Sequence, residues 1–331
     1  MPFKLVMLPP QLSKTRGWPE RLSAELHGIS VVVPDNMELA EEAIHDADAV
    51  CGRFLPPELL RKAKRLRWLQ APFAGAPPGY YYPELIAHPL VVTNMRDTFS
   101  DHIGTHIMSM VLAFARGLHR YIRHQLQREW RPLPQGEGII HLPDATALIV
   151  GVGGVGCETA RLANAFGMRV IGVDVRRKQC PPGMAELHRP DKLDDLLPEA
   201  DFVLMTAPHT PATEGMFDRA RFRRMKRSAF YINTGRGNTT RLDDLVAALV
   251  AGNIAGAGLD VFAQGSRAHD SQVRLDDDDP LWTMPGVIIT PHVASSGPYM
   301  YDRMFEVLLD NCRRFTAGKA LRNVVDKENW F

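Results

Sequence analysis

Apolar residues in the first hundred positions form short β-branched runs, separated by longer stretches with helical spacing. The short runs are bounded by Gly, Pro and Asp and predict strands, and Glu58–Lys64 is one of the helix-like segments between them. The predicted strands are Phe3–Leu8, Ser30–Val33, Ala49–Arg53, Leu66–Gln70 and Val91–Asn94. Strands that alternate with helices in this way are typical of βαβ units and a parallel sheet.

A second series of strands begins after residue 145. Its members are Thr146–Val150, Arg169–Asp174, Asp201–Thr206, Ala229–Asn233, Gly256–Val261 and Val287–Thr290. The apolar residues between Leu242 and Val250 follow helical spacing, and Gly252 stands where that helix should end. Six strands with helices between them are the number in a doubly wound dinucleotide-binding domain.

Two long helical patterns flank this second series. The first runs from about Ser100 to Trp130 and should connect two domains, and the second covers about Met300–Ala317. Too few strands remain near the C-terminus for a further domain, so we expect the last helix to pack on the first domain. The predicted fold class is therefore α/β, with a Rossmann domain over residues 100–294 inserted into a flavodoxin-like domain formed by residues 1–99 and 295–331.

Composition and charge exclude several classes of protein. The 331 residues include 39 Lys and Arg against 38 Asp and Glu, so a formal net charge of +1 gives no field that would hold nucleic acid or a membrane. The four cysteines lack C-x-x-C spacing, and we expect neither disulfides nor a metal site. The apolar runs are shorter than the ~20 residues that span a bilayer. The first eight residues predict a strand rather than a leader. We expect a soluble, cytoplasmic protein.

A glycine-rich loop follows the strand at 146–150 and precedes a helical run that ends at Phe166. In this pattern Gly151 permits a tight turn, Gly153 lets the backbone approach a pyrophosphate, and Gly156 lets the helix pack closely on the strand. Asp174 ends the next strand, about 20 residues on, where a carboxylate binds the ribose hydroxyls of NAD. The sequence therefore predicts an NAD site.

Two arginines leave the choice of cofactor open. Arg176 and Arg177 follow Asp174 directly and could bind the 2′-phosphate of NADP. Solvated arginines in a turn are the simpler interpretation, so NAD is the preferred prediction and NADP the alternative.

Three reactive side chains follow strands of the second series. Arg236 comes after the fourth strand, Asp260 lies at the end of the fifth, and His292 comes after the sixth. Because parallel α/β sheets bind ligands at the carboxyl ends of their strands, we expect the three to share one edge with the glycine loop.

Several motifs in the same order resemble the D-isomer-specific 2-hydroxyacid dehydrogenases. They are Leu66–Gly75, the glycine loop, Met225–Lys226, Ile232–Gly237, Gly258–Val261, Pro280–Trp282 and Thr290–His292, within a match from about Leu66 to Val325. The resemblance implies that the enzyme transfers a hydride between NAD(P)H and a small 2-oxo acid. It assigns cofactor binding to residues 100–294 and substrate binding to residues 1–99 with 295–331.

The resemblance also assigns roles to individual residues. Arg236 would bind the carboxylate and carbonyl oxygen of the substrate, and His292 would protonate the developing alkoxide. Further substrate contacts would come from Arg53, Phe73, Ala74 and Gly75. The implied cofactor contacts are Gly151, Gly153, Gly154, Val155, Gly156, Asp174, Arg176, Ala207, Pro208, Thr213, Thr234, Asp260 and Ala294.

One position departs from the family pattern. The family has a Glu five residues after the Asp matched to Asp260, where it pairs with the catalytic His, but here that position is Gly265. Gln264 could orient the imidazole after a one-residue shift, as the Gln of formate dehydrogenases does. Alternatively, Asp270 or one of Asp276–Asp279 replaces the Glu.

Other features admit simpler interpretations. His102 and His106 lie four apart on a predicted helix, and we expect packing rather than metal binding. The basic run 219–227 should be a solvated face, and residues 80–82, all Tyr, could line a pocket or contact a partner. The resemblance implies a homodimer that uses the long helix and residues 130–141. A nucleotide-sensing, corepressor-like protein on the same fold is the alternative function.

Overall fold

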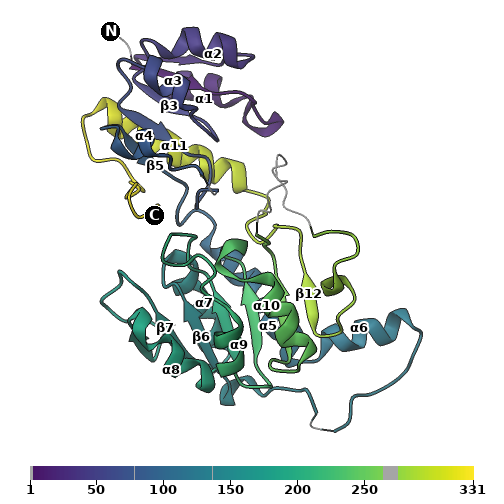
Figure 1. Cartoon of the computed structure of the whole chain (residues 1–331). Helices are drawn as coiled ribbons and strands as arrows, with labels where there is room; N and C mark the ends of the chain where they lie inside the picture. The colour runs from purple at the N-terminus through teal and green to yellow at the C-terminus, as the bar shows by residue number, and fades with distance from the viewer. Residues whose placement is uncertain (1–2, 78, 136, 264–274) are drawn as a thin grey trace. The chain divides into compact units, whose positions relative to one another are not determined.

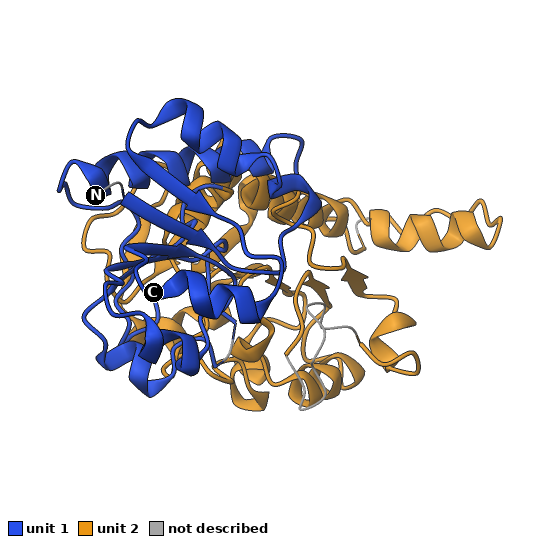
Figure 2. Cartoon of the chain, turned by 90° about the horizontal axis from the view of Figure 1, so that it is seen from above, with its two compact units in different colours: residues 1–98, 297–331 blue, residues 99–296 orange. Residues whose placement is uncertain are grey.

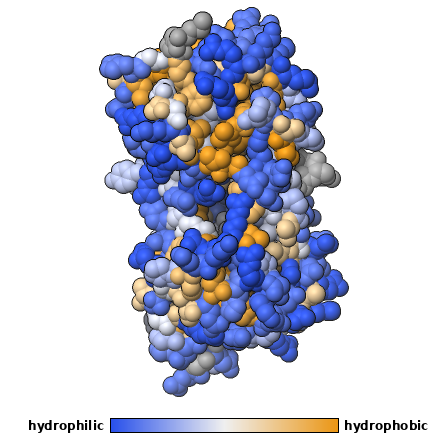
Figure 3. Space-filling model, turned by 90° about the vertical axis from the view of Figure 1, so that its left-hand side faces the viewer, coloured by the Kyte–Doolittle hydropathy of each residue, from blue (hydrophilic) through white to orange (hydrophobic). Residues whose placement is uncertain are grey.

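The computed structural model describes residues 3–77, 79–135, 137–263 and 275–331. Contacts between Cα atoms divide the chain into two compact units (Figure 2). Unit 1 comprises Met1–Thr98 and Gly297–Phe331, and unit 2 comprises Phe99–Ser296. Figure 3 shows one face of the molecule, on which hydrophilic residues make up most of the surface.

Unit 1 contains a parallel sheet with the order β2-β1-β3-β4-β5 in the described part of the chain. This is the flavodoxin-like order. The strands are β1 (Phe3–Met7), β2 (Ile29–Val32), β3 (Ala49–Cys51), β4 (Trp68–Gln70) and β5 (Val91–Thr93). The helices are α1 (Trp18–Glu25), α2 (Met37–Ile44), α3 (Pro57–Lys62), α4 (Pro83–Ala87) and α11 (Met300–Thr316), with a 3-10 turn η1 (Ser13–Thr15) (Figure 1).

Helices cover both faces of this sheet. Apolar residues of α2, α3 and α4 form one core with Val6, Val50 and Leu69. On the other face α11 packs through Phe315, whose ring stacks on Trp68 at a centroid distance of 5.5 Å. The C-terminal helix therefore belongs to the same unit as the first hundred residues.

Unit 2 contains a second parallel sheet, with the order β12-β11-β10-β9-β6-β7-β8 among the described residues. The strands are β6 (Thr146–Val150), β7 (Arg169–Val173), β8 (Glu186–His188), β9 (Phe202–Met205), β10 (Phe230–Asn233), β11 (Gly256–Leu259) and β12 (Val287–Ile289). All six predicted strands are present. The seventh, β8, was missed because it is three residues long, mostly polar and at the sheet edge.

The helices of unit 2 cover both faces of the sheet. They are α5 (Ser100–Ala115), α6 (Leu118–Leu126), α7 (Gly154–Ala165), α8 (Leu193–Leu196), α9 (Arg219–Arg224) and α10 (Leu242–Val250). Short 3-10 turns are η2 (Leu142–Asp144), η3 (Pro190–Lys192), η4 (Leu197–Glu199), η5 (Gly237–Thr239) and η6 (Pro280–Trp282). Alternate residues of β6 face opposite cores, so Ile149 packs with α5 and α7 while Leu148 packs with α8, α9 and α10. The predicted fold class, two parallel-sheet α/β domains, is confirmed.

The predicted long helix from Ser100 to Trp130 is wrong in one respect. The chain breaks between α5 and α6 at Gly117, whose φ is +66°. Glycine adopts this left-handed conformation without steric cost, so the break depends on the backbone freedom of Gly117. Within the described chain, no helix combines the length and apolar character needed to cross a membrane.

Candidate cofactor and catalytic site

The three glycines of the loop between β6 and α7 differ in their surroundings. A Cβ on Gly151, which has φ +97°, would lie 2.5 Å from the Ala207 amide nitrogen, and one on Gly156 would lie 2.2 Å from Gly151 O. Apart from Gly153 itself and its two sequence neighbours, no atom lies within 4 Å of a Cβ placed on Gly153. Two of the glycines thus serve close packing, and Gly153 leaves open space at the start of α7.

The N-terminus of α7 suits an anion. Gly153 is its N-cap and supplies no side-chain cap, and the first turn, which includes Gly154 and Val155, carries no acidic residue. The first N–H groups of a helix have no partner inside it and carry the positive end of the helix dipole. This arrangement fits the pyrophosphate of a dinucleotide.

Asp174, directly after β7, bonds to the backbone of the glycine-rich loop. Its Oδ2 accepts a hydrogen bond from Val152 N at 2.7 Å, and its Oδ1 accepts from the backbone N–H groups of Arg176 and Arg177, also at 2.7 Å. A carboxylate has about four lone-pair sites, so further acceptor capacity remains for ribose hydroxyls.

Three arginines lie near Asp174: Arg176 and Arg177 follow it in the chain, and Arg189 Nη1 donates to its backbone carbonyl oxygen at 3.4 Å. Arg177 Nε donates to Val152 O at 2.7 Å, and Arg189 donates to the carbonyl oxygen of Val175. Arg176 has an exposed side chain. Sequence reasoning did not single out Arg189, because it follows the unpredicted strand β8 and carries no motif.

The loop after β9 lies against the glycine loop. Thr206 Oγ1 donates to Gly151 O at 2.6 Å, and Ala207 is the residue that excludes a side chain from Gly151. The Thr213 hydroxyl donates to Pro208 O at 2.7 Å and holds the turn together. Of the predicted cofactor contacts on this loop, Ala207 therefore borders the glycine loop, while the Thr213 hydroxyl is bonded within its own turn.

Arg236 stands after β10, in a segment whose backbone is closely packed. A Cβ on Gly237 would lie 1.8 Å from the carbonyl carbon of Phe262, so this position requires glycine. Arg236 Nη1 donates to Gly235 O at 2.6 Å, and burial lowers the pKa of the guanidinium from its ordinary value. The Thr234 hydroxyl is buried and lacks a hydrogen-bond partner among the described residues, as expected of a group that bonds to a ligand.

Asp260 holds the loop that carries His292. Its side chain is 1% exposed, Oδ1 accepts from Thr290 Oγ1 at 2.6 Å and from Val293 N at 2.9 Å, and Oδ2 accepts from Ala294 N at 3.0 Å. Asp260 and Ala294 were predicted to contact the cofactor. In the structure, the hydrogen bond between them helps to fix the His292 loop.

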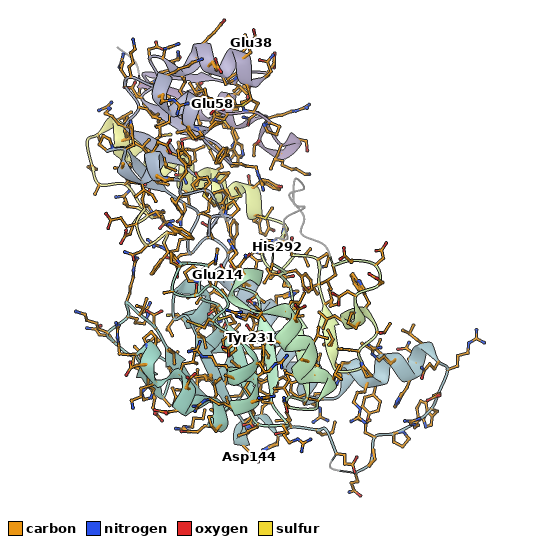
Figure 4. All side chains as sticks on the ribbon, viewed as in Figure 1. Glu38, Glu58, Asp144, Glu214, Tyr231 and His292 are labelled. Carbon is orange, nitrogen blue, oxygen red and sulfur yellow. The ribbon has the colours of Figure 1, made fainter. Side chains whose placement is uncertain are left out.

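His292 is exposed and has φ +55°, in the left-handed region that few non-glycine residues adopt. Partial desolvation lowers the pKa of its imidazole, the positive charge of Arg236 lowers it further, and the negative charge of Asp260 opposes both. The three residues predicted to meet at one sheet edge follow the neighbouring strands β10, β11 and β12. Figure 4 shows His292 at the same end of unit 2 as Glu214, with Tyr231 inside the unit and Asp144 at its opposite end.

The sequence offers Gln264 or a nearby Asp as the partner of His292, in place of the family Glu. Gln264, Gly265 and Asp270 fall outside the described residues. Within the run Asp276–Asp279, the last carboxylate accepts from Leu281 N at 2.9 Å and begins the turn η6. Among the described residues, no group of three or more His, Cys, Asp or Glu could hold a metal ion.

Unit 1 carries the predicted substrate loop. The Phe73 carbonyl accepts from Met95 N at 2.9 Å and the Ala74 carbonyl accepts from Asn94 Nδ2 at 2.9 Å, which fixes the segment that includes Gly75. Arg53 is exposed.

The three tyrosines after this loop pack within unit 1. The rings of Phe73 and Tyr80 meet edge to face at 4.9 Å. Tyr80 and Tyr81 are buried, and the Tyr82 hydroxyl donates to Leu55 O at 2.7 Å.

Comparison with known proteins decides the family. The sequence model described as "D-isomer specific 2-hydroxyacid dehydrogenase, NAD binding domain" matches residues 108–294. The chain belongs to the D-isomer-specific 2-hydroxyacid dehydrogenase family. Unit 2 thus contains an NAD-binding domain, and the protein is an oxidoreductase of this family, as the motifs predicted.

Individual relatives cover almost the whole chain. A glyoxylate reductase of Korarchaeum cryptofilum is 31% identical over 303 residues, which are 89% of this chain and 87% of that protein. The crystal structure of a D-isomer-specific 2-hydroxyacid dehydrogenase family protein from Aeromonas salmonicida is 30% identical, with a TM-score of 0.79 over 99% of this chain and 100% of the other. An NADPH-dependent glyoxylate/hydroxypyruvate reductase of Sinorhizobium meliloti, solved with NADP and sulfate, is 27% identical, with a TM-score of 0.81 and complete coverage of both chains.

Proposed function

We propose that this enzyme reduces a small 2-oxo acid, such as glyoxylate or hydroxypyruvate, to the D-2-hydroxy acid with NAD(P)H. The observation that carries the proposal is geometric: Arg236, Asp260 and His292 follow three neighbouring strands, β10, β11 and β12, and Asp260 bonds to the loop that carries His292. This arrangement combines a fixed cation with a proton donor at the strand ends of a cofactor-binding sheet. Relatives with glyoxylate reductase and glyoxylate/hydroxypyruvate reductase names support the choice of substrate.

The residues divide the reaction between them. The Arg236 guanidinium binds the substrate carboxylate and polarises the C2 carbonyl oxygen. The reduced nicotinamide, when bound, supplies the hydride that adds to C2. The His292 imidazolium gives its proton to the resulting alkoxide and becomes neutral imidazole, and oxidation of the hydroxy acid reverses both transfers. Arg53 and the backbone of Phe73–Gly75 are proposed to bind the substrate carboxylate.

The corepressor-like alternative is not favoured. It predicts cofactor binding without turnover, whereas relatives named glyoxylate reductase, glycerate dehydrogenase and glyoxylate/hydroxypyruvate reductase are enzymes, and this chain carries both Arg236 and His292. Gln264 remains our candidate for the neighbour that orients His292.

A substrate panel tests the function. Oxidation of NADH and NADPH is followed at 340 nm with glyoxylate, hydroxypyruvate, pyruvate, 2-oxoglutarate and phenylpyruvate. We expect turnover with the smaller acids and its loss in Arg236→Ala, because the carbonyl oxygen then loses its cation. Tight NADH binding without turnover on any acid would instead favour the sensing protein.

For the cofactor we propose NAD as the preferred form, with NADP accepted. Asp174 suits the ribose hydroxyls of NAD, and the nearby arginines offer a place for the 2′-phosphate of NADP. Replacement of Arg176 by Ala should raise the KM for NADPH and leave the KM for NADH unchanged. Equal effects on both cofactors would exclude a phosphate contact at Arg176.

We further propose a homodimer built on α6. This helix buries none of its residues, and Figures 1 and 2 show it extending away from the body of unit 2. Leu118, Ile122 and Leu126 lie on one face and are 47%, 54% and 79% exposed, which is the surface a second copy would cover.

The four cysteines are free thiols, which supports a cytoplasmic location for the enzyme.

A further inference from the structure

His106 lies on α5, a different element from those that carry the reactive residues, but it reaches the His292 loop. Its Nε2 is 3.0 Å from Thr290 Oγ1 and 3.7 Å from Asp260 Oδ1. The His106 side chain is 19% exposed and the Asp260 side chain only 1%. The histidine therefore makes a specific polar contact rather than only packing.

The direction of each hydrogen bond follows from the chemistry of the groups. An ionised carboxylate only accepts, so the Thr290 hydroxyl donates its hydrogen to Asp260 Oδ1, at 2.6 Å. The Thr290 oxygen is then an acceptor toward His106, whose Nε2 must carry a hydrogen and donate it. The three side chains form a chain of hydrogen bonds that runs from His106 through Thr290 to Asp260.

This chain ends on the backbone around His292. Thr290 precedes His292 by two residues, and Asp260 also accepts from the N–H groups of Val293 and Ala294, which follow it. His292 itself has a positive φ of 55°, a conformation that persists only where the surroundings hold it. The loop is thus held on both sides of the strained residue by one network.

We propose that His106 is a positioning residue for His292, acting through Thr290 and Asp260; the catalytic part of this proposal rests on the proposed function. Loss of the Nε2–H donor frees Thr290 to rotate away from Asp260 and loosens the loop. The imidazole of His292 then becomes better hydrated and less firmly aligned with the substrate oxygen. The charges of Arg236 and Asp260, which act on the His292 imidazole, do not change when the donor is lost.

Four variants test the proposal. His106→Leu removes the donor, and His106→Gln restores an N–H at the same number of bonds from Cβ. Thr290→Val removes the middle hydroxyl with little change of shape. His102→Leu is the matched control, since it lies one turn earlier on α5 and its buried Nε2 has no hydrogen-bond partner among the described residues. Melting temperatures establish that each variant is folded.

Two readouts are measured on each folded variant. The first is the pKa of His292 in the protein without substrate, from the pH titration of its ring signals by NMR, assigned with His292→Gln. Because partial desolvation lowers this pKa in the native protein, we expect His106→Leu and Thr290→Val, which loosen the loop, to raise it measurably above the native value. The second readout is the kcat for 2-oxo acid reduction, which should fall about tenfold in both while the KM for NADH stays unchanged.

His106→Gln should match the native protein in both readouts, and His102→Leu should do the same. The proposal is overturned if His106→Leu cannot be distinguished from His102→Leu, or if His106→Gln is as impaired as His106→Leu. If the native protein turns over no 2-oxo acid, the proposed function fails, and the NMR titration still decides whether His106 controls His292.

Discussion

Gly151 and Gly156 leave no room for a side chain, whereas Gly153 faces open space at the start of α7. The G-x-G-x-x-G pattern therefore combines two physical requirements. Gly151 and Gly156 let β6, α7 and the Ala207 segment approach one another closely. Gly153 matters for what lies outside the chain, since a Cβ there would project toward the space that a pyrophosphate would use.

This difference separates folding from binding in a pair of variants. Gly156→Ala places a Cβ 2.2 Å from Gly151 O and should destabilise the protein by about 1–3 kcal/mol, as overpacking does. Gly153→Ala should keep its stability but weaken NADH binding about tenfold or more, because the methyl group displaces the pyrophosphate. Urea unfolding and fluorescence titration with NADH measure the two effects. Equal NADH affinity in Gly153→Ala and the native protein would show that the pyrophosphate lies elsewhere.

At the scale of elements, buried polar groups attach α11 to the sheet of unit 1. Asn311 is fully buried, and its Nδ2 donates to Gln70 Oε1 at 3.0 Å while its Oδ1 accepts from Arg322 N at 2.7 Å. One side chain thus joins α11, β4 and the segment after the helix. Apolar packing alone would not fix the register of α11 on the sheet so specifically.

Replacement of Asn311 by Leu tests this attachment. The change keeps the volume but leaves buried partners without hydrogen bonds, so the free energy of unfolding should fall by about 2–3 kcal/mol. Glu306→Leu, at an exposed position of the same helix, is the control and should change stability by less than about 0.5 kcal/mol. Urea denaturation followed by circular dichroism measures both. A similar loss in the two variants would contradict a specific role for Asn311.

Periodicity predicted the elements that have strong local signals and missed those set by their surroundings. The strands of unit 2 that lie inside the sheet are continuous apolar runs, because helices cover both faces. Strand β8 has only Leu187 as an apolar residue and forms by pairing with β7. Gly117 divides the predicted long helix, a glycine effect that the apolar pattern on either side does not reveal.

The candidate site shows the same limit. Strand-end reasoning predicted that Arg236, Asp260 and His292 share one edge, since this follows from parallel topology. It did not predict that both carboxylate oxygens of Asp260 accept hydrogen bonds from the His292 loop, or that His106 contacts the Thr290 hydroxyl. These contacts join positions up to 184 residues apart, and no local pattern encodes them. Whether Gln264 faces His292 stays a prediction.

For the whole molecule, the exposed face of α6 raises the question of what stabilises the helix. A nine-residue helix with no buried residue is marginal in water, and its attachment to unit 2 includes hydrogen bonds from Arg123 to the carbonyl oxygens of Thr283 and Met284. Trp130, just beyond the helix, is fully exposed. A second copy of the chain would bury these apolar side chains and supply the missing tertiary contacts.

Two charges on this face should therefore separate the copies. We expect the native protein to sediment at twice the 37.0 kDa chain mass. The double variant Ile122→Glu with Leu126→Glu should raise the dimer dissociation constant about a hundredfold or more, because each carboxylate would have to be buried without a partner. Val250→Glu, at a site that is 75% exposed on α10, introduces a comparable charge and should leave the dimer intact. Analytical ultracentrifugation over a range of protein concentrations measures the constants. If the native chain sediments as a monomer, or if the α6 variant stays as dimeric as Val250→Glu, then α6 is not the dimer contact and its stability must come from unit 2 alone.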